Sequence, residues 1–225
     1  MRIILFDIDG TLLLSGGAGL EALRRIFRKH YDVAEAVDGI EFHGLTDPLI
    51  LRNIARKSLA RDLEPAEIDQ LRDWYVESLG EVLQTSSPRF RVLAGAREMV
   101  TELHGRDDVL MGLATGNFEA AAWAKLGRAG LESYFNFGGF GSDAEDRQEL
   151  TQRAVDRARE RVGNDPPVIV VGDTIHDVRC AHGVGADCLA VATGNASPAV
   201  LEEAGARWVV SSLDAPEARE ALGLV

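Results

Sequence analysis

Residues 3–11 hold the strongest fold signal in the chain: Ile3-Ile4-Leu5-Phe6-Asp7-Ile8-Asp9-Gly10-Thr11. The four apolar residues that open this stretch are typical of a strand in a parallel sheet that is covered on both faces. Two carboxylates follow closely, and Gly10 allows a sharp turn in which the backbone can approach an anion. Because ligands bind beyond the carboxyl ends of the strands in open α/β sheets, the same stretch predicts a ligand site.

Further apolar runs of strand length lie downstream, at residues 109–114, 168–171 and 189–192, with a weaker one at 208–210. Patterns of helical length and spacing lie between these runs, for example at 118–126 and 149–162. Alternating strands and helices of this kind predict an α/β fold with a Rossmann-like parallel sheet.

Residues 15–90 interrupt the alternation, because they contain no convincing buried strand. Three helices are expected in this segment, at about 19–30, from Asp47-Pro48 and after Pro65. An Asp or a polar residue followed by Pro is a common helix start, since Pro is tolerated at the first helical position.

The predicted organisation is a core domain of residues 1–14 and 91–225, with a helical domain of residues 15–90 inserted after the first strand. The flanks of the insert, Ser15-Gly16-Gly17 and Ser86-Ser87-Pro88, have the composition of hinges.

The composition excludes several classes of function. The chain has 225 residues, with 24 Lys and Arg against 36 Asp and Glu, so its formal net charge is −12. This acidity argues against nucleic acid as a partner, but it permits a small phosphorylated ligand. No apolar run approaches the roughly 18 residues of a membrane helix, and no signal peptide is visible, so we expect a cytoplasmic protein. Cys180 and Cys188 are expected to be free thiols.

Two more groups of polar residues follow apolar runs. Asp173 and Asp177 lie in Gly172-Asp173-Thr174-Ile175-His176-Asp177, and two strand ends that both supply aspartates would suit Mg²⁺. The alternative is that Asp173 only caps the next helix. Thr115-Gly116-Asn117 combines a hydroxyl, a glycine amide and a helix start, which suits an anion; the alternative is a plain Thr cap.

In this order, the three groups resemble the motifs of the haloacid dehalogenase-like (HAD) superfamily of phosphohydrolases, over almost the whole chain. The resemblance implies a core sheet with an inserted helical cap, and catalysis through an aspartyl phosphate. Asp7 matches the nucleophile, and Asp9 matches the general acid and base. Asp173 matches the Mg²⁺ ligand, together with the Asp7 side chain and the Asp9 carbonyl. Asp177 is a further acidic position, as a ligand through water or as an orienting residue.

The resemblance also implies contacts to phosphate and substrate. Thr115 and the amide of Gly116 match the phosphate clamp, and Gly10 and Asn117 are expected beside it. In the cap, Thr46 is a candidate substrate contact. The neighbouring Asp47 is another candidate, although a helix N-cap is its simpler interpretation.

One position departs from the family pattern. The family usually has a Lys at a helix start before the last motif, whereas this chain has no Lys after Lys125, which comes too early in the order. Since a phosphate site needs one fixed cation, Arg147 is expected to supply it, with Arg153 as the alternative. The preceding Gly138-Gly139-Phe140-Gly141 is expected to be a flexible turn.

The predicted function is Mg²⁺-dependent hydrolysis of a small phosphate monoester, with phosphoglycolate-like substrates considered first by analogy alone. A sugar phosphomutase would keep the same motifs, and a binding module phosphorylated on Asp without turnover is an alternative of another class. A dehalogenase is disfavoured, because it needs neither Asp9 nor Asp173. The expected partner is a small phosphorylated metabolite, and the sequence does not choose between monomer and homodimer.

Overall fold

The structure is a computed structural model that describes residues 1–85 and 89–224. Its core is a six-stranded sheet in the order β5-β4-β1-β6-β7-β8, in which every neighbouring pair is parallel. The strands are β1 (Arg2–Phe6), β4 (Val109–Thr115), β5 (Gly138–Phe140), β6 (Val168–Gly172), β7 (Asp187–Val191) and β8 (Trp208–Val210). The expected α/β fold with a parallel sheet is confirmed.

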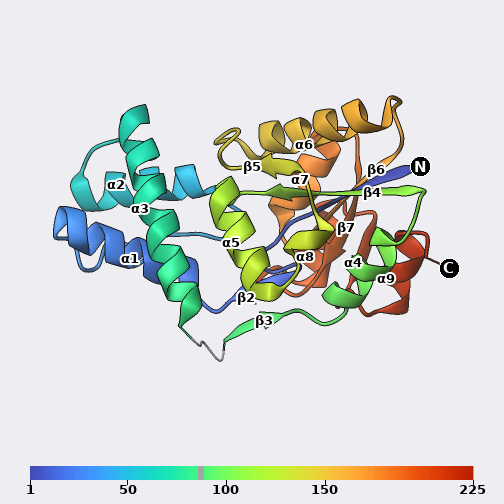
Figure 1. The fold of residues 1–225 in the computed structure, drawn as a ribbon, viewed down its shortest axis with the longest axis horizontal. Helices are drawn as coiled ribbons and strands as arrows, with labels where there is room; N and C mark the ends of the chain where they lie inside the picture. The colour runs from blue at the N-terminus through green and yellow to red at the C-terminus, as the bar shows by residue number, and fades with distance from the viewer. Residues whose placement is uncertain (86–88, 225) are drawn as a thin grey trace.

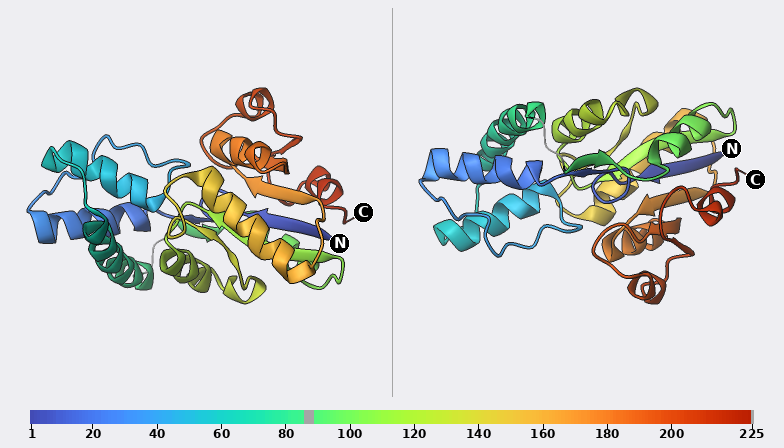
Figure 2. Two further views of the ribbon diagram at one scale, coloured as in Figure 1. Left: turned by 90° about the horizontal axis from the view of Figure 1, so that it is seen from above. Right: turned by 90° about the horizontal axis from the view of Figure 1, so that it is seen from below.

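Helices cover both faces of this sheet, as Figures 1 and 2 show. Ile4 and Phe6 of β1 pack on the side of α4 (Ala96–His104), α5 (Glu119–Ala129) and α9 (Pro216–Ala221). Ile3 and Leu5 point the other way, toward α6 (Arg147–Val162), α7 (Ile175–Gly183) and α8 (Pro198–Glu203). Because successive strand residues face opposite sides, a wholly apolar β1 is what a two-sided core requires. A short 3₁₀ helix, η1 (Glu132–Tyr134), follows α5.

Three helices form a separate cluster at the end of the molecule opposite the two termini (Figure 1). They are α1 (Ala18–Tyr31), α2 (Asp47–Leu59) and α3 (Pro65–Gln84). Their buried apolar side chains, among them Phe27, Leu51 and Leu79, pack into a core of their own that also receives Phe118. The three helices predicted from the sequence are therefore present.

A two-stranded ribbon joins this helical cluster to the sheet. β2 (Leu13–Ser15) pairs antiparallel with β3 (Phe90–Val92), so the chain leaves the core and returns to it side by side. The expected boundaries, 14/15 and 90/91, both fall within the ribbon. Of the two expected hinges, Ser15-Gly16-Gly17 has Gly16 and Gly17 at φ 67° and 88°, and residues 86–88 lie outside the described residues.

Gly138-Gly139-Phe140-Gly141, expected to be a flexible turn, is instead mostly the buried strand β5. The glycines there serve close packing, since a Cβ on Gly139 would lie 1.9 Å from the carbonyl oxygen of Leu150 in α6. A strand that carries so few apolar side chains gives no periodic signal, and for this reason the sequence pattern missed it.

Two expectations from composition can be compared with the structure. Cys180 and Cys188 are free and buried. Among the described helices, none is long and apolar enough to cross a membrane.

Candidate active site

The order of the strands brings three of the sequence motifs together. β1 lies between β4 and β6, and all three strands run in the same direction. Asp7 follows β1, Thr115 ends β4 and Asp173 follows β6, so their side chains meet at the carboxyl edge of the sheet. The chain crosses from one side of β1 to the other at this point, which is where α/β sheets bind ligands.

A tight turn after β1 fixes the first motif. The amide of Asp7 still donates to the carbonyl of Val171 at 2.9 Å, and the amide of Gly10 donates to that of Leu13 at 2.9 Å. Gly10 has φ 88°, and a Cβ on it would lie 2.3 Å from a carboxylate oxygen of Asp173. Only glycine fits there, because the position combines a left-handed backbone with a close approach to that carboxylate.

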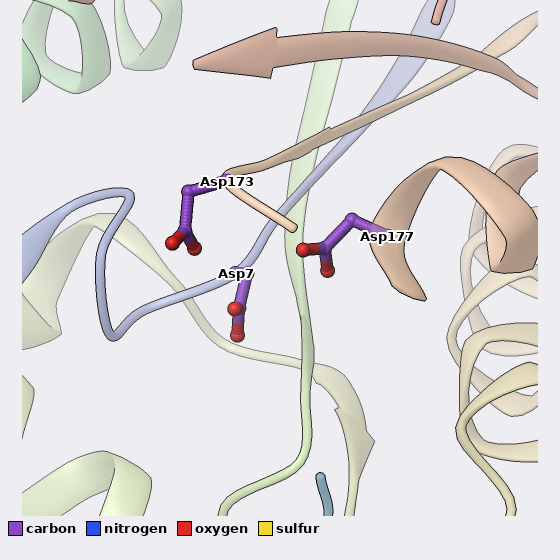
Figure 3. Close-up of side chains that lie close together, drawn as sticks. All are labelled: Asp7, Asp173 and Asp177. Atoms are coloured by element: carbon purple, nitrogen blue, oxygen red, sulfur yellow. The ribbon is translucent and has the colours of Figure 1, made fainter. Parts of the chain in front are cut away.

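Asp7, Asp173 and Asp177 form a buried acidic cluster in which one oxygen of each lies within 4.8 Å of the others (Figure 3). The side chains come from the ends of β1 and β6 and from the first turn of α7. Burial raises the pKa of Asp7 to about 6, although the Arg147 charge opposes this effect. Burial, followed by the charges of Asp177 and Asp7, raises the pKa of Asp173 to about 8. So much negative charge in one buried place is typical of a cation site.

Arg147, the first residue of α6, reaches into this cluster. Its Nη2 lies 3.0 Å from Asp7 Oδ2 and 2.5 Å from Asp177 Oδ1, and its Nη1 donates to the Gly44 carbonyl at 3.2 Å. Burial alone would lower the pKa of the guanidinium, but the two carboxylates raise it instead. The alternative cation, Arg153, is exposed and pairs with Glu149 at 3.7 Å. The structure thus places Arg147 at the site and Arg153 away from it.

Asp177 is held by the start of its own helix. Its Oδ2 accepts hydrogen bonds from the amide of Thr174 at 3.0 Å and from its hydroxyl at 2.7 Å, in a capping box. The N-cap of α7 is therefore Thr174, and the interpretation of Asp173 as that cap is wrong. Asp173 instead accepts a hydrogen bond from Thr11 at 3.3 Å, which leaves most of its carboxylate available to a ligand.

The donor set of the cluster fits a hard cation. It consists of carboxylate oxygens, which Mg²⁺ and Ca²⁺ prefer. Both oxygens of Asp177 already have partners, so Asp7 and Asp173 fit direct coordination, and Asp177 fits the orientation of Arg147. The Asp9 side chain lies outside the cluster, so a contribution of Asp9 to a metal would come through its main-chain carbonyl.

Asp9 has a partner that the sequence analysis missed. Lys125 Nζ lies 2.6 Å from Asp9 Oδ2 and 2.5 Å from Asn117 Oδ1, and the Asn117 amide donates to Asp9 at 2.9 Å. Burial would raise the pKa of Asp9, but the charge of Lys125 and these hydrogen bonds lower it overall. Lys125 is 5% exposed. Lys125 lies in α5, whose 11 residues make about three turns, and no motif marks it, because its position depends on how α5 packs against β1.

The Thr115-Gly116-Asn117 segment lines the site without capping a helix. The N-cap of α5 is Phe118, so the alternative of a plain Thr cap is wrong. Thr115 is fully buried, and its Oγ1 accepts a hydrogen bond from the Asn117 side chain at 2.8 Å. A Cβ on Gly116 would lie 2.5 Å from the carbonyl oxygen of Leu45, so the helical insert packs closely against this loop.

The start of α2 is the part of the insert that touches the core here. Asp47 does not cap α2, because Thr46 is the N-cap; its carboxylate accepts a hydrogen bond from the amide of Phe118 at 2.8 Å. Burial raises the pKa of Asp47 to about 6. The Thr46 hydroxyl donates to the Glu145 carbonyl at 2.8 Å, and Thr46 does not line the cavity. The structure therefore places Thr46 in the contact between insert and core rather than at a ligand.

All these elements surround a cavity of about 570 Å³ between the sheet edge and the helical insert. Most of the expected site residues line it: Asp7, Asp9, Gly10, Thr115, Gly116, Asn117, Arg147 and Asp173. Asp177 lies behind Arg147, which it contacts. Lys125 also lines the cavity. The arrangement places a buried carboxylate, two cations and an acidic cluster that fits a metal ion around one cavity.

Comparison with known protein families agrees with this geometry. A family model described as haloacid dehalogenase-like hydrolase matches residues 1–185. The chain belongs to the haloacid dehalogenase-like hydrolase family. It is therefore a hydrolase enzyme, and the resemblance inferred from the three motifs is confirmed. None of the curated proteins compared with the HAD chain matches it.

Solved structures share the HAD fold along the whole length of the chain. A predicted phosphatase from Clostridium acetobutylicum matches with a TM-score of 0.70 and 18% identity, covering 100% of this chain and 99% of its own. A predicted phosphoglycolate phosphatase from Haemophilus somnus 129pt matches with 0.68 and 15%, covering 99% and 97%. A candidate β-phosphoglucomutase from Bacteroides vulgatus matches with 0.69 and 19%, covering 98% and 88%. At these identities the likeness concerns the fold alone.

Proposed function

We propose that this HAD hydrolase is a Mg²⁺-dependent phosphatase that hydrolyses a small phosphate monoester through an aspartyl phosphate on Asp7. The observation that carries the proposal is the position of Asp7, whose buried carboxylate lies 3.0 Å from Arg147 and belongs to the acidic cluster. A carboxylate can attack an anionic phosphate only where positive charge offsets the repulsion. Arg147 supplies one such charge, and Mg²⁺ held by Asp7 and Asp173 would supply the rest when bound.

Each step of the reaction then has a residue. An Asp7 oxygen bonds to phosphorus while the ester oxygen leaves with a proton delivered through Asp9. Lys125 Nζ donates to Asp9 Oδ2 at 2.6 Å, so the Lys125 ammonium can supply the proton that Asp9 passes to the ester oxygen and can take it back when Asp9 accepts the proton of water. Water next attacks the phosphorus of the aspartyl phosphate, Asp9 accepts its proton, and inorganic phosphate leaves Asp7. Thr115 and the amides of Gly116 and Asn117 would orient the phosphoryl oxygens.

The class of substrate follows from the same site. A single phosphate is bound at the sheet edge, and the remainder of the ester must lie between the edge and the helical insert, so the partner is a small phosphorylated metabolite. Phosphoglycolate-like esters belong to this class and are included because of the sequence resemblance to that group. A sugar phosphomutase would use the same residues, but it would require a sugar bisphosphate to regenerate the phosphorylated Asp7.

The test is phosphate release from a panel of phosphate monoesters, with and without Mg²⁺, by the intact chain and by Asp7→Asn. We expect Mg²⁺-dependent turnover that Asp7→Asn abolishes while its circular dichroism spectrum and thermal unfolding stay native. Full activity in Asp7→Asn, with deamidation back to Asp excluded by mass spectrometry, would refute the nucleophile assignment. Conversion of a sugar monophosphate that depends on added bisphosphate would identify a mutase. A stable acyl phosphate without turnover would identify a binding module.

A further inference from the structure

The cavity is much larger than the phosphate group that it is proposed to bind. Its volume of about 570 Å³ lies within the range of sites that enclose drug-sized ligands. Phosphate occupies the end at Asp7 and Arg147, and the ester of a two-carbon acid would fill only a small part of what remains. The residues that line the remaining volume therefore indicate the size and polarity of the alcohol that the enzyme releases.

The side of the cavity formed by the ribbon and the helical insert carries a set of apolar side chains. Five aliphatic or aromatic side chains from the ribbon and the helical insert contribute to it: Leu14, Leu20, Leu23, Phe42 and Ile50. Leu14, Leu20 and Phe42 are only half-buried, so apolar surface on these residues faces the cavity. Contact with an apolar group of the substrate would remove that surface from water, which is favourable.

Tyr75 is one of the polar groups that interrupt this wall. Tyr75 of α3 lines the cavity, its side chain is 2% exposed, and within residues 1–85 and 89–224 its hydroxyl makes no hydrogen bond, so it is open to the cavity. Burial and the nearby charges of Asp47 and Asp9 raise its pKa, so the hydroxyl keeps its proton at neutral pH. An acceptor atom on the substrate can therefore take the hydrogen bond that this hydroxyl otherwise offers to water.

The charges around the wall are mixed. Asp9 and Asp47 line the cavity, but Lys125 also lines it and lies 2.6 Å from Asp9, so the apolar side chains and not the charges distinguish this wall. Arg89 and Arg91 line it too, but both are exposed, so their charges are screened by solvent and suit the outer end of a ligand.

We propose that the substrate is a phosphate monoester of a largely apolar alcohol, longer than a two-carbon acid, whose body packs on Leu14, Leu20 and Phe42 and offers one acceptor to the Tyr75 hydroxyl. This inference rests on the proposed phosphatase function and names its substrate class. Selectivity comes from the helical insert, while the sheet edge performs the reaction on any ester that reaches it.

The first test compares alkyl phosphates whose alcohols have nearly the same acidity. The intrinsic reactivity of the esters is then the same, and only the size of the alkyl group changes. We expect kcat/KM to rise at least about tenfold from ethyl phosphate to hexyl or 2-phenylethyl phosphate. The reason is that each methylene bound in an apolar pocket stabilises the transition state by about 1–3 kcal/mol. Phosphoglycolate is expected to fall below hexyl phosphate. If phosphoglycolate is preferred, or the alkyl series is flat, this inference is overturned while the phosphatase function stands. If no ester is hydrolysed, both are overturned.

The second test uses matched leucines in the helical insert. Leu20→Ala should lower kcat/KM for hexyl phosphate about tenfold more than for ethyl phosphate. Leu49→Ala is the control, because Leu49 is also half-buried in the insert but does not line the cavity. The control should leave the hexyl-to-ethyl ratio of the parent enzyme in place. Equal ratios in the two variants would overturn the assignment of this wall.

The third test concerns Tyr75. A series of hexyl-length esters carries one ether oxygen in place of a successive methylene. For one oxygen position, Tyr75→Phe should lose at least about fivefold more kcat/KM than it loses on hexyl phosphate, since a hydrogen bond to a buried donor is removed. If the loss is the same for every member of the series, the Tyr75 hydroxyl does not contact the substrate.

Discussion

Arg147 shows what one side chain contributes when the usual lysine is absent. A guanidinium has several donors in a fixed fork, so Arg147 can contact Asp7, Asp177 and the Gly44 carbonyl of the helical insert together. A lysine ammonium at the end of a flexible stem would hold these three partners less precisely. Arg147 therefore pairs with the carboxylate of Asp7 and also links the core to the helical insert.

We expect Arg147→Ala to lower kcat/KM at least about a hundredfold, because it removes the fixed cation beside the reacting phosphate. Arg153→Ala is the control on the same helix, and it should stay within about twofold, since Arg153 is exposed. Steady-state kinetics on one ester measures both. Arg147→Lys keeps the charge, so its kcat/KM should lie between those of Arg147→Ala and Arg153→Ala. This variant shows whether the loss in Arg147→Ala comes from the missing charge or from unfolding. A larger effect at Arg153 would move the cation there.

Lys125 is expected to keep Asp9 and Asn117 in place. Lys125→Met removes the charge but retains most of the buried stem, and it should lower kcat about ten- to a hundredfold, because a displaced acid–base group reacts slowly. The pKa of Asp9, held low by Lys125, should then rise, which moves the acidic limb of the kcat profile to higher pH. Lys29→Met, at an exposed lysine, is the control. An unshifted profile in Lys125→Met would contradict this role.

At this scale the sequence predicted residues that short motifs bring to strand ends. Asp7, Thr115 and Asp173 each follow an apolar run, so their meeting at one edge could be inferred from the topology alone. Lys125 lies outside the motifs, and its place depends on the register of α5 against β1, which no local pattern encodes. The prediction that Thr46 contacts the substrate differs from the structure for another reason. The Thr46 hydroxyl bonds instead to the Glu145 carbonyl, about a hundred residues away in the sequence, and no local pattern predicts such a contact.

Among the elements, strands with large apolar side chains were predictable and β5 was not. β1, β4, β6 and β7 are buried on both faces, so their residues read as continuous apolar runs. β5 pairs with the end of β4 through two glycines whose role is the absence of a side chain. The short α9, and α4 with its N-cap at Gly95, were likewise not predicted, since six to nine residues hold too few turns for a clear period.

The packing of β5 against α6 can be tested with one methyl group. Gly139→Ala would place a Cβ 1.9 Å from the Leu150 carbonyl oxygen, so we expect the free energy of unfolding to fall by at least about 2–3 kcal/mol. Gly127→Ala is the matched control, because Gly127 lies within α5 with nothing within 4 Å of the added atom. It should gain roughly 0.5–1 kcal/mol. Urea unfolding measures both, and similar stabilities would contradict the packing argument.

For the whole molecule, the acidic edge of the sheet conflicts with stability unless a cation is bound. The pKa of Asp173 is raised to about 8 in the fold from its usual value of 3.8, so the fold binds a proton that the unfolded chain has already released. Stability from this group is therefore complete at low pH and is lost as the pH rises through about 8. A metal ion would compete with that proton and remove the loss.

Without metal, we expect the stability of the protein to fall by about 1.4 kcal/mol between pH 7 and 9, which is roughly 3–6 °C in Tm for a chain of this size. Mg²⁺ should raise Tm more at pH 9 than at pH 7, since it binds the ionised carboxylates. Asp173→Asn is the decisive comparison: it should remove most of the decline and the Mg²⁺ effect while remaining folded. A smaller decline near pH 9 is expected to stay, because burial raises the pKa of the Cys180 and Cys188 thiols and the unfolded chain loses those protons first. An undiminished decline in Asp173→Asn would mean that another group carries the buried charge, and an unchanged Mg²⁺ effect would place the metal elsewhere.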